Sequence, residues 1–237
     1  MFQKMLRQQP IPSWSYLAAL TGLIVMFLAV VMGTTIADIV LDDTQLTIVI
    51  GWCLGMALTI AYVIISRGED VEDLRLNESN VRLPLVALLA FGMAILFDLL
   101  SWVFANDQLL ASAELMRVDP QTMTVVGWLI VLIFLVILQP IAEEMILRGL
   151  MYPAFSAALG GRLGFVMTAV FHGMFHFLAY APPPTDGRIM IWYGLILPIM
   201  QGGVLTGVRA VTGSTRASIV AHAMFGVFAL LKVITFA

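Results

Sequence analysis

Long apolar runs recur from one end of the chain to the other, and they restrict the folds open to it. Each run holds about twenty or more residues, enough for an α-helix to cross a hydrocarbon core of about 30 Å. Only 11% of the 237 residues are charged, whereas globular proteins average about 25%. The sequence therefore predicts an all-α, polytopic transmembrane bundle, with residues 1–237 forming one integral membrane domain.

The runs predict seven spans, or eight if a re-entrant segment escapes the pattern. The expected spans are 13–37, 44–66, 84–106, 122–150, 163–181, 189–211 and 216–236. Turn and charge patterns mark the linkers, among them residues 152–162 and the prolines at 182–184. The first run has about 25 uncharged residues, more than the roughly 7–15 of a signal-peptide core, so we expect an uncleaved span.

Basic residues indicate the orientation, because Lys and Arg are retained on the cytoplasmic side of a membrane. A cytoplasmic N-terminus places most of them at cytoplasmic ends, namely Lys4, Arg7, Arg67, Arg75, Arg82, Arg148, Arg162, Arg209 and Arg216. Only Arg117 and Arg188 would face outward. The lack of a targeting extension suits a bacterial cytoplasmic membrane, with membrane lipids as partners. The net charge of −3 and the lack of a basic patch argue against a nucleic-acid partner.

Four ionisable side chains fall inside predicted spans: Asp98, Glu143, Glu144 and Lys232. Each costs about 2.5–3.5 kcal/mol at mid-bilayer, so each needs a partner or a purpose. Asp98 and Lys232 both lie about 21–24 Å from the cytoplasmic ends of their spans. We expect them to form a structural ion pair.

The stretch from Gln139 to Arg148 concentrates the other charges. Glu144 and Arg148 are four residues apart and share one helical face, so the arginine can keep that carboxylate ionised. Glu143 points about 100° away and stays available as a base. Pro140 cannot donate a backbone hydrogen bond, which predicts a kink or a local widening before the carboxylates.

The three histidines of the chain fall in two late spans. His172 and His176 are four residues apart on one face of the fifth span. His222 and Glu143 each lie about 10 Å from the cytoplasmic ends of their spans, so they can share a site. A histidine inside a span usually faces the bundle interior and serves a function.

These residues resemble the motifs of the CAAX protease and bacteriocin-processing (CPBP, or Abi) family, which includes the Ras-converting prenyl endopeptidases. Residues 143–148 resemble its Glu-Glu-x-x-x-Arg motif, residues 172–176 its Phe-x-x-x-His motif, and residues 222–226 its His-x-x-x-Asn or Asp motif. The resemblance covers residues 122–236. It departs at His172, where the family has phenylalanine, and at Gly226, where the family has asparagine or aspartate.

The resemblance implies an intramembrane endopeptidase that cleaves a prenylated or membrane-embedded peptide. Glu143 and His176 would activate the attacking water, His222 would stabilise the oxyanion, and Glu144 with Arg148 would support the base. The cleft would open toward the cytoplasm. Gly226 offers no side-chain donor, so His222 alone, a backbone N–H group, water or His172 would have to compensate. Depth along the fifth span keeps His172 as a substitute for His176.

Three alternatives remain open at this stage. Zinc could be held by Glu143, His172, His176 and His222, but the sequence lacks the His-Glu-x-x-His motif, and no metal is favoured. A non-catalytic scaffold, chaperone or subunit of a membrane protein complex would fit the missing side chain at Gly226. A transporter could use Asp98, Lys232 and the carboxylates as a proton path, but paired broken helices are not evident.

Overall fold

The described residues form seven helical runs that are long and apolar enough to cross a membrane. The computed structural model describes residues 9–41, 45–77, 79–104, 110–181 and 186–236. No strand occurs among these residues, which confirms the all-α prediction. Lys4, Arg7 and the prolines at 182–184 lie outside the described residues.

The first three runs are α2 (Tyr16–Val40), α3 (Gln45–Arg67) with the 3-10 turn η1 (Gly68–Leu74), and α4 (Leu83–Phe104). A 3-10 turn, η2 (Leu115–Arg117), lies in the linker that follows. The last three runs are α8 (Gly161–Tyr180), then α9 (Gly187–Ile191) with η5 (Trp192–Ile196) and α10 (Leu197–Thr212), and finally α11 (Thr215–Phe236).

The fourth run is continuous from Val125 to Leu159 and carries Glu143, Glu144 and Arg148. It consists of α5 (Val125–Leu132), η3 (Ile133–Leu138), α6 (Gln139–Glu144), η4 (Met145–Met151) and α7 (Tyr152–Leu159). The prediction that residues 152–162 form a linker was therefore wrong. The helix ends only at Gly160, whose φ of 85° leaves the right-handed helical region.

Three π-helical segments explain how prolines fit inside these long helices. The segments η3, η4 and η5 are followed within two residues by Pro140, Pro153 and Pro198. A proline ring clashes with the carbonyl four residues earlier in an α-helix, and a π-turn moves that carbonyl away. The predicted widening before the carboxylates is confirmed at η3.

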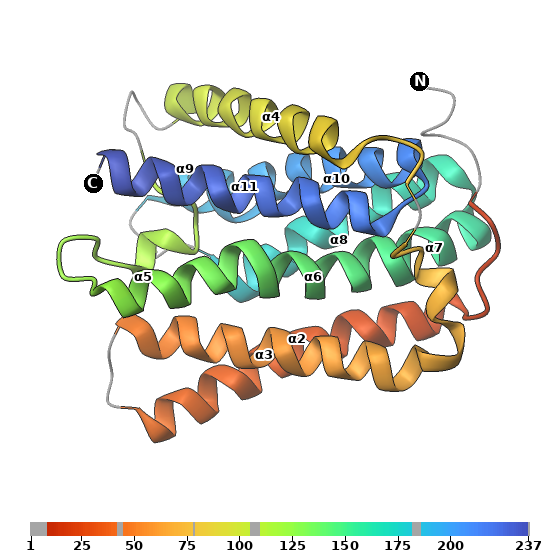
Figure 1. Cartoon of the computed structure of the whole chain (residues 1–237), viewed down its shortest axis with the longest axis horizontal. Helices are drawn as coiled ribbons and strands as arrows, with labels where there is room; N and C mark the ends of the chain where they lie inside the picture. Colours follow the sequence, from red (N-terminus) through yellow and green to blue (C-terminus); the bar gives the residue numbers. More distant parts are fainter. Residues whose placement is uncertain (1–8, 42–44, 78, 105–109, 182–185, 237) are drawn as a thin grey trace.

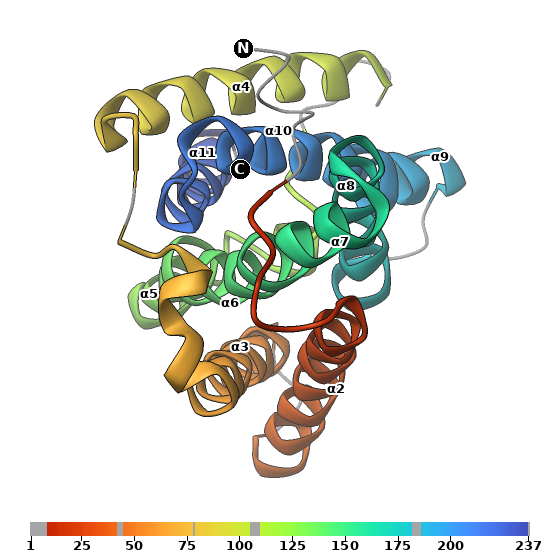
Figure 2. The same cartoon turned by 90° about the vertical axis from the view of Figure 1, so that its right-hand side faces the viewer.

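The fourth run lies between two outer layers of the bundle (Figures 1 and 2). The pair α2 and α3 packs on one side of it, and α4 lies on the opposite side, against α10 and α11. The fourth run, α8 and α11 therefore meet in the interior, which is where the motif residues face one another.

The two ends of the bundle differ in charge. We call the end formed by η1, Gly160 and residues 213–214 the arginine-rich end; it is on the right in Figure 1. The other end is formed by the described linker residues 110–124, by residues 181 and 186 and by the C-terminal end of α11, and we call it the opposite end.

Candidate active site

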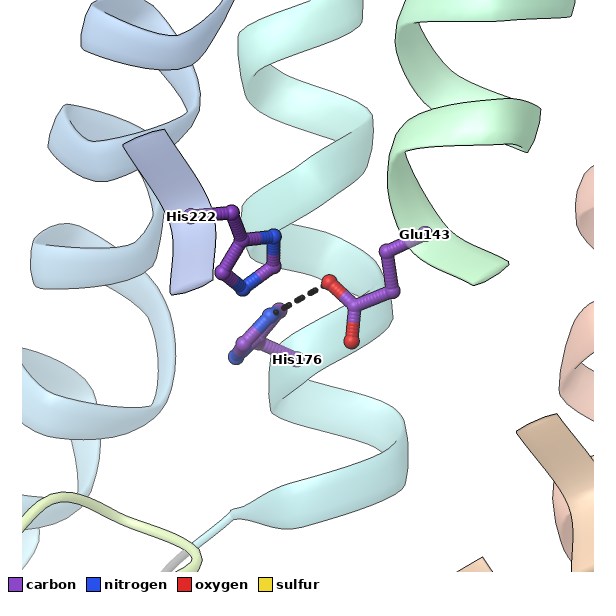
Figure 3. Close-up of side chains that lie close together, drawn as sticks. All are labelled: Glu143, His176 and His222. Atoms are coloured by element: carbon purple, nitrogen blue, oxygen red, sulfur yellow. Dashed lines mark hydrogen bonds and ion pairs between the residues drawn. The ribbon is translucent and has the colours of Figure 1, made fainter. Parts of the chain in front are cut away.

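Three helices bring the predicted site residues together. The fourth run supplies Glu143, Glu144 and Arg148, helix α8 supplies His172 and His176, and α11 supplies His222. All six residues are buried. Residues up to 79 positions apart in the sequence thus form one polar cluster inside an apolar bundle, with Glu143 and both His176 and His222 in view in Figure 3.

Glu143 and His176 form the central contact of this cluster. The Nε2 atom of His176 lies 3.0 Å from Oε2 of Glu143 and donates a hydrogen bond to it. His222 faces the same carboxylate, and one ligand atom from each of these three residues lies within 4.8 Å of the others. The other carboxylate oxygen, Oε1 of Glu143, is buried and makes no hydrogen bond of ordinary geometry to a described residue.

Glu144 holds two partners through a single oxygen. Its Oε1 accepts hydrogen bonds from Nη1 of Arg148 at 3.0 Å and from Nδ1 of His222 at 2.9 Å. The contact with Arg148 joins successive turns of one helix, whereas the contact with His222 joins the fourth run to α11. Glu144 therefore orients the His222 ring and leaves its Nε2 atom for another partner.

Arg148 forms a hydrogen bond with His172. The guanidinium, which has no exposed surface, lies 2.9 Å from Nδ1 of His172 and donates to the Gly202 carbonyl at 2.8 Å. Because a guanidinium can only donate, His172 must accept through Nδ1. His172 Nδ1 is 3.9 Å from Oε2 of Glu143, a longer separation than that of His176. The geometry favours His176 over His172 as the partner of Glu143.

Glu114 belongs to the cluster, although the sequence pattern did not indicate it. It lies in the linker before the fourth span, yet it is only 8% exposed. Its Oε1 atom is 3.4 Å from Nδ1 of His176 and accepts a hydrogen bond from Nε2 of Gln139 at 3.3 Å. Both ring nitrogens of His176 therefore face carboxylates. The only hint in the sequence is Gln139, a polar residue inside an apolar span, which needs a buried partner such as Glu114.

The pKa of Glu114 leads to a testable pH dependence. Burial acts to raise this pKa, but the hydrogen bond and charge of His176 outweigh burial and lower the pKa from 4.5 to about 2. A carboxyl with a depressed folded pKa adds stability above its unfolded pKa and loses it as the pH falls through the folded one. We expect the wild type to be more stable than Glu114→Gln near neutral pH. Between pH 4.5 and about 2 the difference should shrink.

Thermal unfolding in detergent at a series of pH values measures this difference directly. Asp119→Asn is a matched control, because Asp119 is an exposed carboxylate of the same linker. A stability difference that does not change with pH would show that Glu114 is not held ionised by His176.

A cavity of about 90 Å³ connects the cluster with the opposite end of the bundle. A buried water needs about 10–15 Å³ measured in this way, so there is room for several. His176, His222 and Gln139 line its inner part, and Asp98 and Lys232 line its outer part. Asp98 and Lys232 form an ion pair there, and Lys232 also donates to the Leu110 carbonyl at 2.7 Å.

The direction of the cavity conflicts with the expected cytoplasmic opening. The lining residues come from the ends of helices that lie away from the arginine-rich end. A cytoplasmic N-terminus and a cytoplasmic cleft therefore cannot both hold. The depth estimate assumed that the fourth span ends at residue 150, but its helix runs to Leu159, which adds about 14 Å between Glu143 and that end.

Gly226 is a packing position. A Cβ atom at Gly226 would lie 2.3 Å from the carbonyl oxygen of Leu135 in η3. The side chain that the resembled family has here would therefore displace the fourth run from α11. The cavity reaches Gly226, but this close approach leaves no space for an asparagine in the present packing.

We expect Gly226→Ala to lower stability by roughly 1–3 kcal/mol, because overpacking forces backbone shifts. Gly203→Ala is the matched control, since Gly203 is also helical and a Cβ there would meet nothing within 4 Å. The control should be neutral or stabilising by up to about 1 kcal/mol, because alanine favours helices. Thermal unfolding in detergent compares the melting temperatures of the two variants. Equal melting temperatures would contradict the packing role of Gly226.

A metal ion could be held by three of the four residues expected for it. Glu143, His176 and His222 form the only such group among the described residues, whereas His172 is bonded to Arg148. Nitrogen and oxygen donors of this kind suit zinc.

Comparison with known proteins agrees with the resemblance seen in the motifs. Residues 125–228 match a family model described as Rce1-like, type II CAAX prenyl endopeptidase Rce1-like. This stretch contains all three motifs and lies inside the region 122–236. No curated protein and no solved structure matches the chain.

Proposed function

We propose that this integral membrane protein, whose residues 125–228 match the model of the Rce1-like type II CAAX prenyl endopeptidases, is an active intramembrane endopeptidase. It hydrolyses a peptide bond of a lipidated or membrane-embedded substrate. The observation that supports the proposal is the contact of 3.0 Å between Glu143 and His176, because the His176 side lines a cavity with room for water.

Glu143 is the general base in this mechanism. Its Oε1 atom lacks a hydrogen bond of ordinary geometry, and a buried acceptor left unpaired is costly, so a water molecule has a natural place there. Glu143 takes a proton from this water while the water oxygen bonds to the scissile carbonyl carbon. The proton then passes to the leaving amine as the carbon–nitrogen bond breaks. Base catalysis of this kind contributes about 10²–10⁴ in rate.

His222 stabilises the oxyanion. Glu144 accepts a hydrogen bond from its Nδ1 atom, so Nε2 is the atom left to face the developing charge, and it donates to the oxyanion when the ring is the doubly protonated imidazolium. Arg148 fixes Glu144 and His172 at the same time. The loss of one oxyanion donor costs about 10²–10³ in turnover, which makes the orientation of His222 important for the rate.

Glu114 and Gln139 are positioning residues for His176. We expect Glu114→Gln to lower kcat about 10–100-fold, the range seen when a residue that orients a functional histidine is lost. KM should stay close to the wild-type value, and Glu114→Asp should recover part of the activity. A change in KM alone, or equal defects in both variants, would contradict this role.

A cleavage assay tests the proposed activity. The protein is purified in detergent and incubated with a prenylated peptide, the same peptide without its prenyl group, and a transmembrane peptide. Cleavage that is lost in His176→Ala and His222→Ala but unaffected by a chelator supports water activation without a metal. Cleavage lost on chelation and restored by zinc assigns the three-residue group to an ion. No cleavage of any of the three peptides would count against the activity.

A non-catalytic role in a membrane protein complex is the second candidate. The observation in its favour is Gly226, where close packing replaces the polar side chain of the family. Wild type and His176→Ala would then be equally inactive, and both would co-purify with the same partner from native membranes.

A further inference from the structure

We propose that the cavity opens on the extracytoplasmic side of the membrane, and that the substrate is a membrane-attached peptide whose scissile bond is reached from that side. The sidedness follows from the cavity and the charges alone, whereas the substrate class rests on the endopeptidase function proposed above.

The cavity belongs to one half of the bundle. Helix α4 lines it with residues 94–101, near its end at Phe104, and α11 lines it with residues 222–232, near its end at Phe236. The sixth run lines it with residues 193–201, near its beginning at Gly187. No lining residue lies in the described linkers of the arginine-rich end, whereas Leu110 and residues 112–114 of the opposite end do line it.

The charges of the two ends assign them to the two sides of the membrane. Among the described residues, the arginine-rich end carries Arg67, Arg75, Arg82, Arg162, Arg209 and Arg216. The opposite end carries Arg117 and, at the beginning of α9, Arg188. Short linkers rich in Lys and Arg remain in the cytoplasm during insertion, and acidic residues contribute little to this choice. The arginine-rich end is therefore cytoplasmic, and the cavity faces away from it.

The opposite end also carries the features that a substrate meets first. The linker that contributes Glu114 runs past the cavity, so this extracytoplasmic segment contributes directly to the His176 site. Lys232 is paired with Asp98 and so adds no net charge to the outer part of the cavity. Glu114 and Glu143 both face the single imidazole of His176, so these three groups keep one carboxylate charge in excess, which favours a peptide with neutral or basic residues around the scissile bond and disfavours an acidic one.

Cysteine labelling in intact bacterial cells tests the sidedness without any reference to activity. The free Cys53 is first replaced in a Cys53→Ala background. Gln121→Cys then reports on the opposite end and Asn77→Cys on the arginine-rich end, both at exposed positions. An impermeant maleimide should label Gln121→Cys in intact cells and Asn77→Cys only after permeabilisation. The reverse pattern would overturn the proposal and leave the endopeptidase function standing.

Oriented membrane vesicles then test the substrate class. The probe is a farnesylated peptide with a sulfonated, impermeant fluorophore, made in a basic and an acidic version. Right-side-out vesicles should cleave the added basic version faster than the acidic one, and inside-out vesicles should cleave either only after permeabilisation. Cleavage by sealed inside-out vesicles alone would refute the substrate class. If the labelling pattern holds but neither vesicle type nor detergent-solubilised protein cleaves the probe, the substrate class and the proposed activity on this probe both fail, while the sidedness stands.

Discussion

Glu143→Gln is expected to abolish peptide hydrolysis while leaving the fold intact. Glutamine has nearly the shape of glutamate and can still pair with Nε2 of His176, so the contact of 3.0 Å loses its charge without leaving a hole. It cannot accept a proton from water, so turnover should fall about 10²–10⁴-fold, the contribution of a general base. Initial rates on the prenylated peptide, together with the melting temperature in detergent, measure the two effects separately.

Glu144→Gln is the informative comparison, since the two carboxylates are neighbours in the sequence. Glu144 accepts from Arg148 and His222, so its loss should lower the melting temperature as well as the rate. Retained activity in Glu143→Gln, with lost activity in Glu144→Gln, would exchange the roles of the two residues.

Arg148→Met is expected to destabilise the protein by about 3–5 kcal/mol, because it leaves a buried carboxylate without its charge partner. Arg148 has no exposed surface, and its guanidinium reaches Glu144, His172 and the Gly202 carbonyl. Methionine preserves most of the side-chain volume, so the loss of stability measures the contribution of the polar contacts. Thermal unfolding in detergent gives the change.

The double variant Glu144→Gln with Arg148→Met separates charge from packing. Two residues in one network should show non-additive effects, and the double variant should be less destabilised than the sum of the single ones. The exposed Arg216→Met is the control and should change stability by less than about 0.5 kcal/mol. Strict additivity would mean that Glu144 and Arg148 do not stabilise each other.

Most of the fold could be predicted from hydrophobicity alone. All seven spans are present, because a run of about twenty apolar residues has few alternatives in a membrane. The error at residues 152–162 arose because Tyr152 and Pro153 read as a turn. A π-turn in front of the proline lets the helix continue, and such a turn depends on the surrounding packing.

The site could be predicted where its residues follow helical spacing. Glu144 with Arg148 and His172 with His176 are pairs of this kind, and the first forms a salt bridge. Contacts between helices could not be derived in this way, including that of Glu144 with His222. Glu114 was missed because a carboxylate in a linker is normally solvated, and only the tertiary fold brings it to His176.

The packed half of the bundle between the candidate site and the arginine-rich end has a bioenergetic consequence. Ile146, Leu147, Leu150 and Met151 have no exposed surface, and they fill the helix beyond the carboxylates. A continuous file of water past ionisable groups would conduct protons across an energised membrane. We expect these four side chains to interrupt such a file, so that water entering through the cavity can reach the carboxylates and imidazoles without discharging the proton gradient.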